Sequence, residues 1–131
     1  MIVVDASALV AIGDEEADGD SFLSVLSWND GLISSVNYVE AGLILIGRRR
    51  LLNQTQLDVW LKGLGVSVST DENLAALAMQ AYLTFGRGYH PARLNLADSF
   101  AYALARRLDA PLLYKGDDFA LTDIRSALQP M

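Results

Sequence analysis

The chain has 131 residues, which is enough for one domain with a buried core and too short for two. It contains no cysteine, which excludes disulfides and thiolate metal sites, and no apolar run reaches the roughly 18 residues that span a bilayer. The net charge of −6 argues against strong non-specific binding to nucleic acid. These properties favour a cytoplasmic protein with no membrane association, and the 52% hydrophobic content suits a homodimer or a complex.

The charge is unevenly distributed along the sequence. Residues 1–30 contain seven acidic residues and no lysine or arginine, whereas arginines cluster at 48–50 and 106–107 and around His90. If some of the acids bind a metal ion, their charge is cancelled locally. The acidic total is therefore compatible with a small site for a polyanion.

The first half of the chain alternates short β-branched runs with helical spacing. In chain order it predicts a strand at 2–4, a short helix at 6–13, an acidic loop at 14–20, a helix at 22–28 and a strand at 32–35. Asn37 is expected to cap a helix that runs to the arginines at 48–50, where basic side chains suit the negative end of the helix dipole.

The second half continues the alternation. In chain order it predicts a helix at 53–64, a strand at 66–68, a helix at 71–85, a glycine-rich loop at 86–93, a helix at 95–108, a strand at 111–114 and a turn at 115–119. Asn53, Asp71 and Asn95 are the expected helix caps, and residues 121–131 are too weakly patterned to assign. The alternation predicts a single α/β domain with a mostly parallel central sheet of four to five short strands flanked by helices.

Acidic side chains follow the predicted strands or begin the predicted helices. Asp5 comes directly after the first strand, Asp117 and Asp118 come just after the last, and Glu40 and Asp98 lie early in their helices. In parallel α/β sheets, ligands bind beyond the carboxyl ends of the strands. Because converging carboxylates repel each other unless a cation lies between them, the pattern predicts a site for Mg²⁺ or Mn²⁺.

Each acid also has a purely structural interpretation. Glu40 with Asn37, and Asp98 with Asn95, have the spacing of a capping box. Asp5 could cap a helix, and the paired aspartates could form an ordinary turn. Each structural interpretation is sufficient for its own residue, but the expected placement of four acidic positions at one edge of the sheet favours a metal site.

Other chemistries find less support. His90 is the one histidine, so a Ser-His-Asp triad is unsupported, and no Walker loop or dinucleotide fingerprint is present. A phosphoacceptor signalling domain is an alternative, because Lys115 follows a strand. It lacks the usual acidic pair at the first strand, since Asp5 is followed by Ala6.

Several segments together resemble a known family. They are residues 2–11, Glu40, 94–103 and 112–124, with 85–95 similar to one subgroup. In these segments the chain resembles the PIN-domain family, specifically the VapC toxins of bacterial toxin–antitoxin pairs. The resemblance covers almost the whole chain and implies one PIN-like ribonuclease domain, 1–131.

The resemblance implies an Mg²⁺-dependent endoribonuclease, the toxin of a type II pair, that hydrolyses RNA phosphodiester bonds by metal-activated water. Mn²⁺ is a possible substitute, and the products would carry 5′-phosphate and 3′-hydroxyl ends. Asp5, Glu40 and Asp98 would be catalytic acids at the metal. The fourth acid would be Asp118, which is favoured, or Asp117.

The resemblance also implies supporting residues and partners. Ser7 and Ser99 are candidates to hold carboxylates in place, whereas Ala6 replaces a frequent threonine. The candidates for contact with the RNA backbone are Arg87, His90, Arg93 and Lys115. A VapB-type antitoxin is the implied protein partner, and a catalytically silent antitoxin-binding module is a further alternative.

Overall fold

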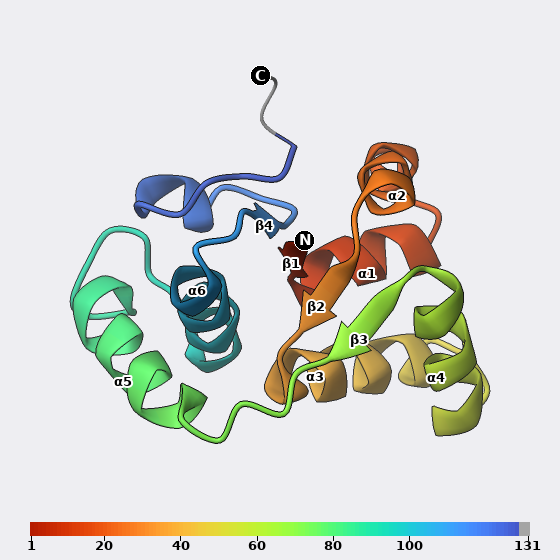
Figure 1. Ribbon diagram of the computed structural model, residues 1–131, viewed down its shortest axis with the longest axis horizontal. Helices are drawn as coiled ribbons and strands as arrows, with labels where there is room; N and C mark the ends of the chain where they lie inside the picture. Colours follow the sequence, from red (N-terminus) through yellow and green to blue (C-terminus); the bar gives the residue numbers. More distant parts are fainter. Residues whose placement is uncertain (129–131) are drawn as a thin grey trace.

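Four short strands form one parallel sheet in the order β3-β2-β1-β4 (Figure 1). The central strands are β1 (Ile2–Val4) and β2 (Gly31–Ile33), and the edges are β3 (Val66–Val68) and β4 (Leu112–Leu113). The computed structural model describes residues 1–128. It confirms the predicted α/β fold with a parallel sheet.

Six α-helices connect and cover the strands within residues 1–128. They are α1 (Ala6–Gly13), α2 (Gly19–Trp28), α3 (Ser35–Gly47), α4 (Gln54–Gly63), α5 (Leu74–Phe85) and α6 (Leu96–Leu108). A 3₁₀ turn, η1 (Phe119–Leu121), follows β4. No helix among these residues is long and apolar enough to cross a membrane.

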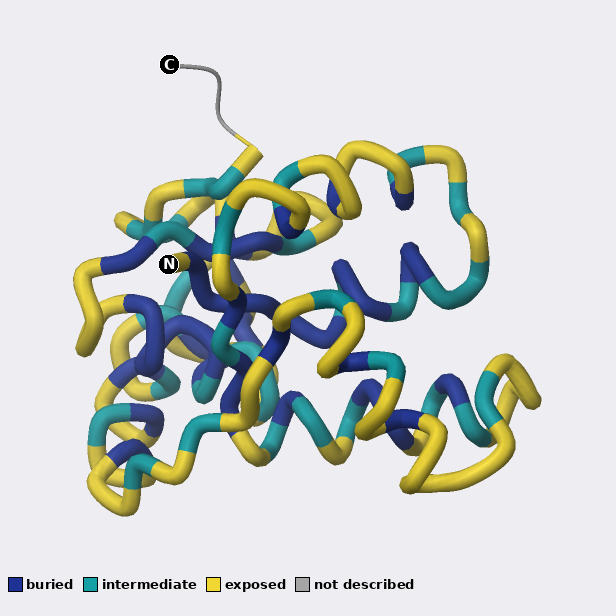
Figure 2. Tube along the Cα trace, turned by 45° about the vertical axis from the view of Figure 1, so that its right-hand side comes forward, coloured by how far each residue is buried: buried dark blue, intermediate teal, exposed yellow. Residues whose placement is uncertain are grey.

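The core lies on both faces of the sheet, because side chains alternate along each strand. Ile2 and Val4 of β1 pack with residues of α1 to α4, and Val3 packs with α5 and α6. All three side chains are buried, and Figure 2 shows the buried segments gathered in the middle of the fold. Burial on both faces explains why β1 is a continuous apolar run.

The strand order reverses next to β1. From β1 the chain adds β2 and then β3 on one side, and it later returns to place β4 on the other side of β1. The backbone N–H of Asp5 donates to the Leu113 carbonyl (2.9 Å), so the ends of β1 and β4 are held together. This is the switch point at which open α/β sheets bind ligands.

The start of α3 differs from the prediction. β2 begins at Gly31 and ends one residue before Ser34, which therefore caps α3 and accepts a hydrogen bond from the Asn37 N–H (3.0 Å). The prediction of Asn37 as the cap is wrong. Asn37 instead lies buried in the first turn, and its side-chain amide donates to the Ala97 carbonyl of α6 (2.9 Å).

Two further helix starts were predicted inaccurately. α2 begins at Gly19, three residues before the predicted start, and α5 begins at Leu74 rather than at a cap on Asp71. Asp71 accepts the N–H of Asn73 in the preceding turn and pairs with Arg107 (2.5 Å). The caps at Asn53 and Asn95 are confirmed, since each side chain accepts a backbone N–H from the first turn.

The weakly patterned tail contacts the sheet. The Leu112 N–H donates to the Arg125 carbonyl (2.8 Å), and the Ala127 N–H donates to the Leu112 carbonyl (2.9 Å). These two hydrogen bonds form an isolated parallel bridge between Leu112 of β4 and Ser126 of the tail. The last three residues of the unassigned tail, 129–131, lie outside the described residues.

We expect Asn37→Ala to lower the free energy of unfolding by about 2–3 kcal/mol, because the Ser34 hydroxyl and the Ala97 carbonyl would lose their buried partner. Urea denaturation measures this change. Asn29→Ala is a matched control, because it removes a bond to Val25 within α2 and should cost about 1 kcal/mol. Equal losses for the two variants would contradict a special role for the α3–α6 link.

Candidate functional site

Asp5 directly follows β1 and caps α1, and the residue is only 4% exposed. Its Oδ2 accepts two hydrogen bonds from Ser7, one from the backbone N–H (3.1 Å) and one from the hydroxyl (2.6 Å). Its Oδ1 is buried and has no hydrogen-bond partner. A buried carboxylate oxygen without a partner is rare in folded proteins and indicates a ligand site.

Ser7 links Asp5 to the end of β4. Its Oγ donates to the Asp5 carboxylate and accepts the backbone N–H of Lys115 (2.9 Å). Ser7 therefore makes the contact with a carboxylate that the sequence predicted for it. The bond also fixes where the turn after β4 leaves the sheet.

Three of the predicted acids line one cavity of about 230 Å³. Its lining residues are Asp5, Ala6, Ser7, Val10, Glu16, Glu40, Ile44 and Asp98. β1 and α1 contribute one side of the cavity, α3 contributes Glu40, and α6 contributes Asp98. Segments far apart in the sequence thus bring their carboxylates to the switch point.

The capping box expected from the sequence forms at Asp98 but not at Glu40. Asp98 does form a capping box: its Oδ2 accepts the Asn95 N–H (3.0 Å), and its own N–H donates to Asn95 Oδ1 (2.8 Å). The box uses Oδ2 and leaves Oδ1 for another partner. Glu40 forms no such box, because α3 is capped by Ser34 and Glu40 lies beyond the first turn.

The cavity raises the pKa of all three carboxyls. Burial raises the pKa of Asp5 to about 6, against the hydrogen bonds from Ser7, and the charge of Glu40 adds to the increase. The pKa of Asp98 is also raised to about 6, chiefly by burial, with a further contribution from the charges of Asp5 and Asp118. The pKa of Glu40 is raised by burial, lowered by the Asn37 side chain and raised by Asp98. The acids therefore repel one another across the cavity.

Asp117 and Asp118 lie in the exposed turn before η1. The charge of Asp118 contributes to the raised pKa of Asp98, which places it within electrostatic reach of the cavity. The Asp117 carbonyl accepts the Ala120 N–H (3.1 Å), so the backbone of Asp117 helps to form the 3₁₀ turn. Asp118 is thus the better placed of the two.

The family model of the PIN domain matches residues 2–124. The chain belongs to the PIN-domain family. It is 42% identical to Ribonuclease VapC42 of Mycobacterium tuberculosis over 129 residues, covering 96% of this chain and 98% of that protein. It is 37% identical to Ribonuclease VapC30 of the same organism over 131 residues, covering 98% and 100% of the two chains. Ribonuclease VapC of Mycolicibacterium smegmatis is 37% identical over 126 residues, with 94% and 97% covered.

Ser99 and His90, two further predicted site residues, make contacts within their own segments. The buried hydroxyl of Ser99 donates to the Asn95 carbonyl (2.8 Å), so Ser99 supports the first turn of α6 and does not hold a carboxylate. His90 accepts the Ala92 N–H at Nδ1 (3.0 Å) and packs against Phe85. These contacts give His90 a structural role in its loop. The sequence predicted only a contact with RNA for this residue.

The predicted basic residues lie in different surroundings. Arg87 and Arg93 are exposed, and the charge of Arg87 lowers the pKa of Asp98, so Arg87 lies close to the cavity. The ammonium group of Lys115 pairs with Glu16 (3.0 Å) and Asp18 (3.4 Å).

Glu16 is the cavity residue that the sequence did not reveal. It belongs to an acidic loop, which by itself is typical of a solvated surface segment. The cavity and the ion pair with Lys115 distinguish it from its neighbours. The residue in the sequence that could have indicated Glu16 is Lys115. It is a basic residue that follows β4, close to the acidic residues of the predicted site.

The donor chemistry of the PIN-domain site fits Mg²⁺. Its available donors are carboxylate oxygens, and Asp5 Oδ1 is buried and unpartnered. Among residues 1–128, no group of three or more Asp, Glu, His or Cys side chains is placed so that it could hold an ion directly. Mg²⁺ usually retains several waters, so more widely spaced carboxylates suit a hydrated ion.

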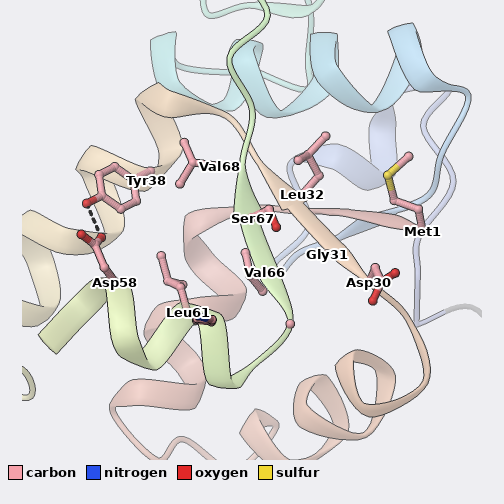
Figure 3. Close-up of a pocket in the computed structure, with 12 residues that line it drawn as sticks. Met1, Asp30, Gly31, Leu32, Tyr38, Asp58, Leu61, Val66, Ser67 and Val68 are labelled. Carbon is pink, nitrogen blue, oxygen red and sulfur yellow. Dashed lines mark hydrogen bonds between the residues drawn. The ribbon is translucent and has the colours of Figure 1, made fainter. Parts of the chain in front are cut away.

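A larger cavity, of about 910 Å³, lies along β3 and the start of β2 (Figure 3). Tyr38 and Asp58 meet at its side, where the Tyr38 hydroxyl donates to Asp58 (2.6 Å). Its lining includes none of the predicted site residues. Size alone would select this cavity, whereas the predicted carboxylates converge on the smaller one.

We expect Asp5→Asn to stabilise the metal-free protein at neutral pH by up to about 3 kcal/mol, as a pKa raised from 3.8 to about 6 implies. The folded state binds the proton more tightly than the unfolded state, so wild-type stability falls as pH rises from about 4 to about 6. The advantage of the variant should therefore vanish near pH 4 and be complete above pH 7.

Urea denaturation with EDTA between pH 4 and 8 measures this difference. The exposed Asp30, which lies outside the acid cavity, provides the matched variant Asp30→Asn. A gain for Asp5→Asn that does not change with pH would contradict the raised pKa.

Proposed function

We propose that this PIN domain is an Mg²⁺-dependent endoribonuclease and the toxin of a type II toxin–antitoxin pair. The observation that carries the proposal is the convergence of Asp5, Glu40 and Asp98 on one cavity around a buried, unpartnered oxygen of Asp5. Relatives that match nearly the full chain are named ribonuclease VapC, which supports RNA as the substrate.

The proposed roles follow from the surroundings of each acid. When bound, Mg²⁺ or its substitute Mn²⁺ neutralises charge on the scissile phosphate and lowers the pKa of a coordinated water. Asp5 and Asp98 would hold the ion, directly or through water, with Asp118 favoured over Asp117 for a further position. Glu40, whose pKa is raised by burial, is suited to take a proton from the attacking water.

RNA would approach the cavity past its few basic groups. Arg87 is exposed and its charge lowers the pKa of Asp98, which makes it a candidate to contact a phosphate next to the scissile bond. Arg93 lies in the same loop, and Lys115 pairs with Glu16, which lines the cavity. The phosphoacceptor alternative gains no support, because Lys115 is paired with Glu16 and Asp18.

The proposal includes partners and a location. The partner would be a VapB-type antitoxin that covers the acidic cavity, with an arginine that pairs with the carboxylates. Exposed apolar side chains on α5 and at the start of α6, namely Met79, Leu83 and Leu96, support a homodimer. The cytoplasm, where RNA targets and antitoxin meet, is the proposed location.

We expect Asp98→Asn and Asp5→Asn each to lower Mg²⁺-dependent RNA cleavage by at least about 100-fold, because each removes a charged oxygen donor. Cleavage of labelled RNA with varied MgCl₂ measures this effect. Asp30→Asn should cleave at the wild-type rate, and cleavage by the wild type that persists in EDTA would overturn the metal mechanism.

Induction of the intact chain alone in bacteria should stop growth, whereas Asp98→Asn should not. Sequencing of RNA 5′ ends after a short induction should show new 5′-phosphate ends that are lacking with the variant. Normal growth with an unchanged set of RNA ends, at confirmed expression, would count against a toxin.

A further inference from the structure

The acidic loop between α1 and α2 is held by cations from distant parts of the chain. Asp14, at the end of α1, pairs with Arg48 and with Arg50 (3.0 Å). Further along the loop, Lys115 pairs with Glu16 and Asp18. Three acids from the part of the sequence that has no bases are thus paired with basic side chains that follow α3 and β4.

Lys115 makes two connections at once. Its backbone N–H donates to Ser7 Oγ, whose hydroxyl donates to Asp5. Its ammonium group donates to both oxygens of Glu16, at 3.0 and 3.3 Å, across 99 residues of sequence. One residue therefore joins the end of β4 both to the carboxylate that ends β1 and to the loop that lines the cavity.

The turn that carries the fourth acid begins at Lys115. Gly116 has a φ of +100°, a conformation that glycine adopts readily, and Asp117 and Asp118 are exposed. The turn ends at Phe119, whose side chain is buried. Asp118 therefore lies between two anchors, the Lys115 contacts on one side and the Phe119 side chain on the other.

We propose that the Lys115–Glu16 ion pair is a positioning device for the acid site, which holds the 115–118 turn so that Asp118 faces Asp98. The inference rests on the proposed ribonuclease function. The side chains of Lys115 and Glu16 are 41% and 33% exposed, and pairs this exposed contribute little to global stability. Loss of the pair should therefore act on the turn and on catalysis while the fold remains intact.

A direct contact between Lys115 and RNA is the competing explanation, and the two differ in what Glu16 does. If the pair positions the turn, Glu16→Ala should reproduce most of the effect of Lys115→Met, because the second partner of Lys115, Asp18, is more distant (3.4 Å). Adding Glu16→Ala to Lys115→Met should then make no further difference. If Lys115 binds a phosphate, Glu16→Ala should leave turnover unchanged, and Lys115→Met should only raise KM for RNA.

Two measurements test the positioning role. Amide hydrogen exchange on the metal-free protein should become faster at Lys115 and Ala120, whose N–H groups donate to Ser7 and Asp117, in Glu16→Ala and Lys115→Met, with α6 unchanged. Cleavage at saturating MgCl₂ should show kcat lowered about 10-fold with KM for RNA retained, at the lower end of the effect of groups that orient metal ligands. Lys115→Arg, which keeps the ion pair, should restore most of kcat.

Arg107→Met is the matched control. Arg107 pairs with Asp71 away from the cavity, and its side chain is 41% exposed, like that of Lys115. Exchange at Lys115 and Ala120 that matches the wild type in both Lys115→Met and Glu16→Ala would overturn the inference, and so would faster exchange with unchanged kcat. A wild type that does not cleave RNA would remove the proposed function, whereas the exchange measurement would still test the pair.

Discussion

The burial of the Asp5 carboxylate is the constraint on which the rest of the site depends. β1 is covered on both faces, so the carboxylate at its end cannot extend into bulk water. Ser7 satisfies one oxygen, and the other has no partner. Such a group costs stability at neutral pH, and costs of this kind are typical of functional sites, where local rules of folding are broken.

The spacing of the acids around Asp5 depends on polar contacts inside the core. α3 and α6 carry Glu40 and Asp98, and Asn37 joins these helices through the Ala97 carbonyl, one residue before Asp98. Because α6 also packs against β1, the three carboxylates are placed by one contiguous set of contacts. The buried hydrogen bond between Asn37 and Ala97 thus helps to set the separation of Glu40 and Asp98.

Much of the fold could be predicted because the strands are short apolar runs separated by helical periodicity. The exact helix starts could not, since Ser34 and Asn37 are both good caps, and only the pairing of β2 shows where the strand ends. At Asp98 the structural and functional interpretations proved compatible, because a carboxylate has two oxygens and the capping box uses one. The role of Glu16 depends on Lys115, 99 residues away, which no local pattern reveals.

The net negative charge of the chain also has a different meaning in three dimensions. Counted along the sequence, it argues against a partner rich in phosphate. In the fold, Asp14 and Glu16 are paired with distant bases, and the charge of Arg87 lowers the pKa of Asp98. Among residues 1–128, the converging acids Asp5, Glu40 and Asp98 take part in no ion pair, and a divalent cation bound between them would reverse their effect on an approaching phosphate. A domain with an acidic total can therefore bind a polyanion at one point while it repels polyanions elsewhere.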